Sequence, residues 1–180
     1  YYGAAPLMWD AVYPLRTSPT VVDQDLDYAS SFELRVTANA RTIKLPQGNA
    51  SGGDRVGRFL FKITVKVGDL YAHRAATFSN QGAYFFDWNN GFQYSYETPT
   101  YDDFTWSTSE GQIWVVSDTF NVYNGTGGSF TTNIDLTTAG LTADKEGAEM
   151  SCELYFLDRS GNLTLIDDDN DAGYTFLNLH

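Results

Sequence analysis

Two groups of aspartates in the chain follow a D-x-D-x-D spacing: Asp167, Asp169 and Asp171, and Asp23, Asp25 and Asp27. Alternate carboxylates from one loop can converge on a hard cation such as Ca2+, which takes roughly six to eight oxygen ligands. Neither group has the central glycine and closing glutamate of an EF-hand loop. The spacing predicts calcium at these aspartates, and the alternative interpretation is a pair of solvated acidic turns.

Residues for covalent catalysis are sparse. A nucleophilic triad needs a serine or cysteine beside a histidine base, and the sequence has two histidines and no G-x-S-x-G elbow. His73 beside Arg74 is most simply a strand residue, and Cys152 is most simply a core residue. No carboxylate pair stands out as the machinery for glycoside hydrolysis. The sequence therefore predicts a protein that is not an enzyme.

Aromatic side chains concentrate between residues 84 and 106. Exposed members of this group could stack on sugar rings, which would make the chain a carbohydrate-binding module, or they could anchor a protein contact. They could equally be core and ordinary surface residues of a sheet. The candidates for a sugar platform are Trp88, Tyr94, Tyr96, Tyr101 and Trp106.

The sequence also contains N-x-S/T sequons at Asn49, Asn124 and Asn162, which are candidate glycosylation sites. The chain begins at Tyr1 without a basic and apolar leader, as in a mature exported protein or in a shortened chain. Taken with the composition, these features favour an extracellular or cell-surface location.

The charge balance limits the partners of the chain. With 23 acidic and 11 basic side chains, the net charge is -12. Nucleic acids and anionic lipid surfaces require clustered Lys and Arg, so we expect neither as a partner. No apolar run approaches ~18 residues, so no membrane span is predicted. The single cysteine excludes an internal disulfide.

An extended N-terminal arm is predicted over residues 1–22, followed by a single domain over residues 23–180. Prolines at 6, 14 and 19 oppose a helix and a central strand. The arm still alternates apolar and other residues, so an extended conformation would present one apolar face. We expect this face to be a subunit interface, formed by Leu7, Trp9, Ala11, Tyr13 and Leu15.

The rest of the chain reads as short strands separated by turns. The clearest strand is 59–67, which a Gly68–Asp69 reversal follows; residues 70–78 fit a strand or a short helix. Residues 21–30 read as an acidic turn, and residues 142–150 could form one helical turn. About a dozen short strands in one domain predict an all-β fold, a two-sheet antiparallel β-sandwich of jelly-roll type.

An acidic β-sandwich with an apolar arm at 7–15 and D-x-D-x-D turns resembles the subunits of archaeal extracellular filaments and tubules. The resemblance is to the cannula proteins of hyperthermophilic archaea and, more broadly, to jelly-roll subunits of bundling pili and biofilm fibres. It implies calcium-promoted self-assembly into a homopolymer, with a strand donated between neighbours. The alternatives are a carbohydrate-binding module and a phage or virion surface structural protein, whose composition has the same bias.

Overall fold

The structure is a computed structural model in which every described element is a β-strand and every pair of named strands is antiparallel. The predicted all-β, antiparallel class is therefore confirmed for this part of the chain. The residues that the structure describes are 7–14, 16–25, 31–37, 56–79, 86–87, 92–93, 98–117, 129–136, 146–166 and 173–179.

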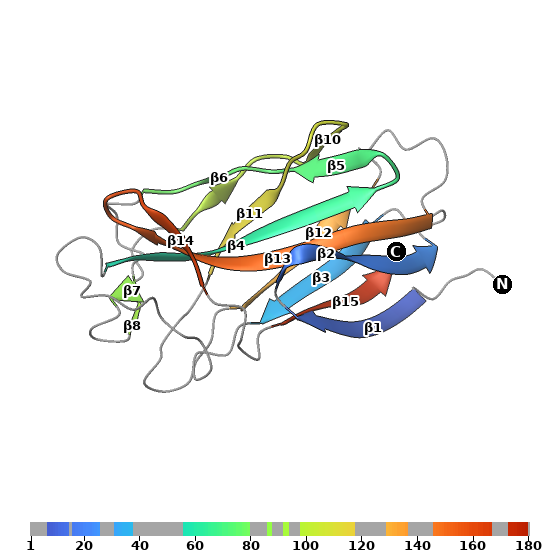
Figure 1. Cartoon of the computed structure of the whole chain (residues 1–180), viewed down its shortest axis with the longest axis horizontal. Coiled ribbons are helices and arrows are strands. Elements are labelled where there is room, and N and C mark those ends of the chain that lie inside the picture. Colours follow the sequence, from blue (N-terminus) through green and yellow to red (C-terminus); the bar gives the residue numbers. More distant parts are fainter. Residues whose placement is uncertain are drawn as a thin grey trace.

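The smaller of the two main sheets has four strands in the order β1-β15-β3-β12 (Figure 1). It brings the N-terminal and C-terminal strands of the described chain side by side. Its strands are β1 (Leu7–Pro14), β15 (Gly173–Leu179), β3 (Ser31–Thr37) and β12 (Ser129–Asp135).

The larger sheet has nine strands around the path β10-β5-β4-β13-β14. The path strands are β10 (Thr105–Ser107), β5 (Leu70–His73), β4 (Val56–Val67), β13 (Glu146–Asp158) and β14 (Leu163–Leu165). Off this path, β11 (Ile113–Val116) and β7 (Phe86–Asp87) pair with β4, β8 (Phe92–Gln93) pairs with β7, and β2 (Arg16–Asp25) pairs with β13. A separate small sheet joins β6 (Ala76–Thr77) to β9 (Thr100–Tyr101).

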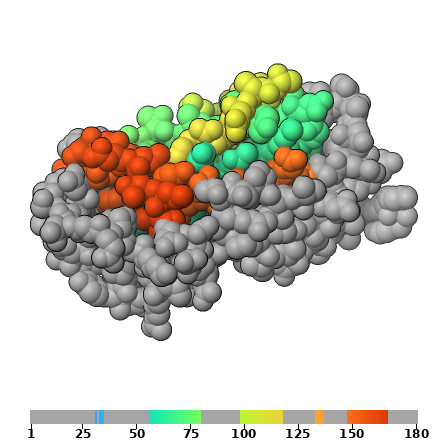
Figure 2. All heavy atoms as spheres, viewed as in Figure 1, coloured from blue at the N-terminus to red at the C-terminus, as the bar shows by residue number. Residues whose placement is uncertain are grey.

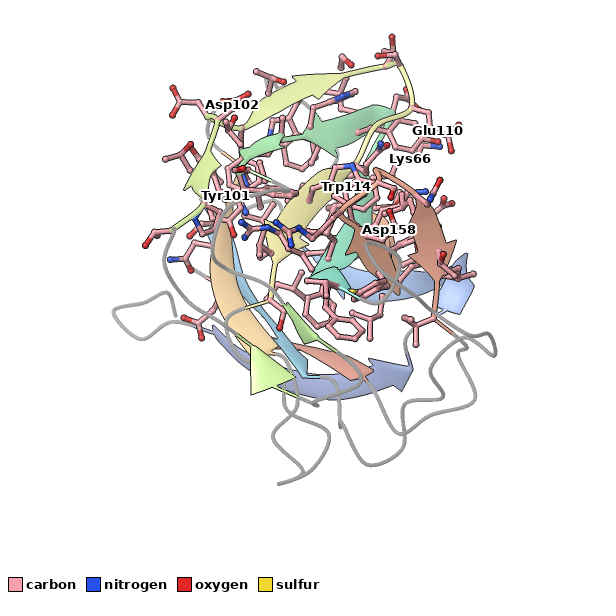
Figure 3. All side chains as sticks on the ribbon, turned by 90° about the vertical axis from the view of Figure 1, so that its left-hand side faces the viewer. Lys66, Tyr101, Asp102, Glu110, Trp114 and Asp158 are labelled. Atoms are coloured by element: carbon pink, nitrogen blue, oxygen red, sulfur yellow. The ribbon has the colours of Figure 1, made fainter. Side chains whose placement is uncertain are left out.

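The core of the described part lies where the two main sheets face each other, as in a β-sandwich (Figure 3). Strand β4 shows why: its inward side chains are fully buried, whereas Lys62, Thr64 and Lys66 between them are only half-buried. This period of two is the pattern of a strand with one face against a core. The buried side chains of the larger sheet include Phe61, Ile63, Val65, Met150 and Cys152, and those of the smaller sheet include Leu34 and Ile134.

Two glycines close the hairpins of the larger sheet. Gly68 has a φ of 58° between β4 and β5, where Val67 pairs with Leu70, so the predicted reversal at this position is confirmed. Gly161 has a φ of 90° in the connection from β13 to β14. Glycine reaches positive φ without steric cost, so both turns can be tight.

Two local predictions need correction, and one open alternative is decided. Residues 21–25 belong to β2 rather than to a turn, because they pair with β13. Residues 146–150 begin β13 rather than a helical turn, because a partner strand lies on each side of them. Of the two alternatives left open for residues 70–78, the structure has strands, at 70–73 and 76–77. In each case pairing with a neighbouring strand outweighs a weak local preference.

The segment predicted as an arm lies in both main sheets. Strand β1 is an edge of the four-stranded sheet, and β2 pairs only with β13 among the described strands. The position 22/23, where the sequence suggested a domain boundary, falls inside β2. Pro14 and Pro19 thus lie in strands with one described neighbour, as their missing N–H groups require.

Candidate functional site

The predicted metal ligands fall largely outside the described residues. Asp167, Asp169, Asp171 and Asp27 lie outside them. The backbone of Asp23 and Asp25 is part of β2, and their side chains are not described. Within the ranges whose side chains are described, no group of three or more histidine, cysteine, aspartate or glutamate residues is arranged to hold a metal ion. Calcium therefore stays a prediction.

The predicted subunit interface is an edge strand in the structure. Leu7, Trp9, Ala11 and Tyr13 lie in β1, which pairs with β15 of the same chain, and Leu15 lies outside the described residues. The β1–β15 register shifts between Met8 and Ala11, which marks an irregularity at Trp9 and Asp10. Donation of this strand to a neighbouring copy stays a prediction.

The hairpin that joins β13 to β14 is closed by a network centred on Asp158. The backbone N–H of Asp158 donates to the carbonyl of Asn162 at 3.0 Å, and that of Gly161 donates to the carbonyl of Asp158 at 3.1 Å. The Asp158 carboxylate accepts two more bonds from Asn162, one from its backbone N–H at 2.8 Å and one from its amide Nδ2 at 3.0 Å. These bonds present β14 in one fixed geometry.

Strand β14 is a sheet edge that exposes apolar side chains. Leu163 is 45% exposed and Leu165 is 43% exposed, and β14 ends the path of the nine-stranded sheet. In Figure 2 the atoms of this hairpin, in red-orange, form part of the visible surface. Soluble proteins usually protect such edges with charge, proline or a covering element.

The hydrogen-bond pattern shows which backbone groups of β14 remain open. Thr164 pairs with Phe156 in β13, and the N–H of Ile166 donates to the carbonyl of Leu154 at 2.8 Å. In an antiparallel ladder, the residues between such pairs direct their N–H and C=O groups to the other side. Leu163 and Leu165 therefore point their backbone groups away from β13, where no described strand lies.

A compact polar and aromatic cluster occupies the outer face of the larger sheet. The Tyr155 hydroxyl donates to Glu153 Oε2 at 3.0 Å, and Lys62 Nζ lies 3.7 Å from Glu153 Oε1. The rings of Trp114 and Tyr155 have centroids 5.7 Å apart and are tilted by 57°. Partial burial and the hydrogen bond to Glu153 raise the pKa of Tyr155 to about 12. The cluster joins β11, β4 and β13 on the face opposite the core.

Of the predicted sugar platform, only Tyr101 and Trp106 have described side chains. Tyr101 is 38% exposed, and the Arg74 guanidinium lies 4.8 Å from its ring centroid. Trp106 is half-buried, and its indole Nε1 donates to the carbonyl of Asp135 in β12 at 3.1 Å. In the view of Figure 3, Tyr101 and Asp102 lie at the left and Lys66 at the right, with Trp114 between them. Trp88, Tyr94 and Tyr96 lie outside the described side chains.

His73 is held in a network with two serines. Its Nε2 lies 3.0 Å from the carbonyl oxygen of Ser109 and 2.9 Å from Ser107 Oγ. Because a carbonyl only accepts, Nε2 carries the proton in this geometry. The Ser107 and Ser109 hydroxyls share a further bond of 2.8 Å.

Asn162 is an exposed residue of the β13–β14 turn, whereas Asn49 and Asn124 lie outside the described residues. Glycosylation at Asn162 would attach a sugar to Nδ2, which donates to Asp158. A glycan there would stand directly beside β14.

No protein-family model, no curated protein and no solved structure matches this chain. The ranges described here contain no helix that is long and apolar enough to cross a bilayer. A function for this chain therefore has to be inferred from its fold and from the geometry of the described residues.

Sequence reasoning missed two features of this surface. The L-T-L alternation of β14 is typical of a strand, but periodicity cannot tell whether a strand lies at the open edge of a sheet. The cluster around Glu153 depends on the register between β13 and β4, which pairs Glu153 with Lys62. Its one sequence signal is the alternation of Glu153 and Tyr155 with buried residues.

Proposed function

We propose that this chain is an extracellular structural subunit that assembles with copies of itself into a filament or tubule by exchanging its N-terminal strand. The observation that carries the proposal is the position of β1. It is an edge strand of one sheet, and a single residue, Leu15, separates it from β2 in the other sheet.

This geometry suits an exchange of strands between copies. The hydrogen bonds that β1 makes with β15 of its own chain are the bonds it would make with β15 of a neighbour. An edge strand leaves its sheet without disturbing a second partner. Residues 7–14 and 16–25 are both extended and follow one another in the chain, one in each sheet. Heterologous exchange of this kind adds copies in an open series, as a filament requires.

A jelly-roll arrangement of the strands and calcium at the aspartate groups complete the proposal. Copies with a net charge of -12 repel one another at close range. Calcium bound by Asp167, Asp169 and Asp171, with Asp23, Asp25 and Asp27 as a second group, lowers this repulsion. Assembly then increases with millimolar calcium and reverses with a chelator.

A disulfide that locks β1 to β15 within one chain tests the exchange. Val12 and Thr175 are register partners, so Val12→Cys with Thr175→Cys can form a bridge. We expect the oxidised variant to remain monomeric in calcium and the reduced variant to form filaments visible by negative-stain electron microscopy. Val12→Cys alone is the control. Filaments formed equally well by the oxidised variant would contradict strand exchange.

The calcium part has a separate test. Asp169→Asn with Asp171→Asn should lower the calcium dependence of assembly, measured by light scattering. The matched control is Asp102→Asn with Asp103→Asn, which removes the same charge at exposed positions. An unchanged response in the first variant would exclude this group as the calcium site.

Carbohydrate binding is the second candidate function, and the cluster around Trp114 favours it. Two half-buried aromatic rings beside the Lys62 ammonium on the outer face of a sheet offer stacking and a hydrogen-bond donor to a sugar, while the buried Glu153 carboxylate holds Tyr155 and Lys62 in place. Saturable quenching of tryptophan fluorescence by a polysaccharide, lost in Trp114→Ala and kept in Trp106→Phe, would support it. A virion surface protein would share the assembly behaviour proposed above.

A further inference from the structure

We propose that β14 is a second self-association edge, at which two copies pair their β14 strands antiparallel about Thr164. This contact rests on the proposed function, because it joins copies that strand exchange has already linked into a filament. It involves a different surface from β1, and a two-fold axis would relate the two copies.

The open backbone groups determine what kind of partner fits. Leu163 and Leu165 direct their N–H and C=O groups away from β13, and only another extended strand supplies the complementary row. The leucines that carry these groups are also the exposed apolar side chains of the hairpin. A partner strand would therefore satisfy the backbone and bury apolar surface at the same positions.

The register of such a pair is self-complementary. When two β14 strands pair antiparallel about Thr164, Leu163 of one copy faces Leu165 of the other, and the reverse holds across the axis. Thr164 then faces Thr164 of the second copy as a non-hydrogen-bonded pair. A register that placed a leucine opposite a threonine would bury less apolar surface and would be less stable. The sequence L-T-L therefore favours a second copy of this chain.

The hairpin itself carries little of the negative charge of the chain. The described residues from Arg159 to Leu165 include a basic residue and no carboxylate, in a chain whose net charge is -12. After β14 the sequence continues into Asp167, Asp168 and Asp169. In an antiparallel pair, Arg159 of one copy lies toward the end of β14 in the other copy. That end is the one that precedes Asp167.

The contact is small, since β14 has three residues. Stable protein interfaces bury about 1,200 Å2 or more, so an isolated pair of copies would associate weakly. Copies already linked in a filament present many β14 strands at once, and multivalency then makes weak contacts effective. The pairing would join filaments laterally.

A crosslink across the two-fold axis tests the register in the full-length chain. Two Thr164 residues in a non-hydrogen-bonded pair have Cα atoms about 4.5 Å apart, which suits a disulfide. Thr164→Cys should form disulfide dimers on mild oxidation at least about tenfold faster than Ser160→Cys, because pairing raises the effective thiol concentration. Ser160 is exposed in the same hairpin, but its opposite position is 168.

A second variant tests the apolar part of the contact. Leu163→Lys with Leu165→Lys, added to Thr164→Cys, should lower the rate of dimer formation to that of Ser160→Cys. Thr77→Lys with Thr108→Lys adds the same charge at exposed positions elsewhere and should leave the rate unchanged. Circular dichroism of each variant checks that the fold is kept.

Failure of this inference and failure of the proposed function give different results. Equal crosslinking rates for Thr164→Cys and Ser160→Cys would overturn the β14 pairing, and so would a glycan on Asn162 of the native protein. Filament formation by the unmodified chain, imaged separately, reports on the proposed function. Single filaments that never associate laterally would also overturn the pairing while leaving strand exchange intact.

Discussion

Gly111 lies directly against the imidazole ring of His73. A Cβ atom at position 111 would overlap the ring atoms Cε1, Nδ1 and Nε2. The ring cannot easily retreat, because Nε2 is hydrogen-bonded to Ser109 and Ser107. This contact joins the end of β5 to the segment that leads into β11 at the edge of the larger sheet.

Gly111→Ala should therefore lower the free energy of unfolding by roughly 1 to 3 kcal/mol, the usual cost of overpacking. Urea unfolding measures the change. In a His73→Ala background the penalty should shrink, because the overlapping ring is gone. Gly161→Ala is the control: its φ is 90° with no atom within 4 Å, so its cost is backbone strain and should be the same in both backgrounds. Equal penalties for Gly111→Ala with and without His73 would contradict the contact.

The Tyr155 hydroxyl should ionise at a higher pH than an ordinary tyrosine. Its pKa of about 12 exceeds the ordinary value of about 10, first through burial and then through the hydrogen bond and charge of Glu153. Near pH 11 the tyrosinate absorbance of the wild-type chain should nearly equal that of Tyr155→Phe, because Tyr155 is still largely protonated there. Glu153→Gln should move this titration toward lower pH. An unchanged titration in Glu153→Gln would leave burial as the cause.

The same shift has a consequence for stability. The folded chain holds the Tyr155 proton more tightly than the unfolded chain. The contribution of Tyr155 to the free energy of unfolding is therefore present below about pH 10 and is lost as pH rises through about 12. Unfolding midpoints of the wild-type chain should fall more steeply over this window than those of Tyr155→Phe. Parallel curves would contradict the assignment.

Cys152 should be unreactive in the folded chain. It is fully buried in β13, and burial, followed by the negative charge of Glu153, raises the pKa of its thiol. Since the thiolate is the reactive form, modification by a thiol reagent should proceed only at the rate of unfolding. Ser160→Cys provides an exposed thiol that should react at once. Rapid modification of Cys152 under native conditions would contradict its position in the core.

Asp158→Ala should loosen the β13–β14 hairpin. Asp158 is 6% exposed, and its carboxylate accepts two bonds from Asn162, so the loss of the carboxylate should cost roughly 1 to 3 kcal/mol in unfolding free energy. Asn162→Ala removes only the side-chain amide bond and should cost less. Amide hydrogen exchange at Thr164 should be faster in Asp158→Ala than in Asn162→Ala. If the two variants are equally stable, the backbone bond from Asn162 contributes little.

Strand type and core face were readable from the sequence where alternation is strong. Residues 61–67 alternate apolar and polar side chains, and β4 buries the apolar set that this pattern selects. The reversal at Gly68 was readable because only glycine adopts positive φ without steric cost. These features depend on residues that are neighbours in the chain, so local chemistry determines them.

The tertiary structure alone decided which strands pair and which edges stay open. Residues 21–25 are acidic enough to suggest a turn, and pairing with β13 makes them a strand. Leu163 and Leu165 are apolar residues of the kind that usually fills a core, yet they are exposed because β14 ends the path of its sheet. Pairing joins residues far apart in the chain, and its free energy depends on a partner strand that the local sequence does not contain.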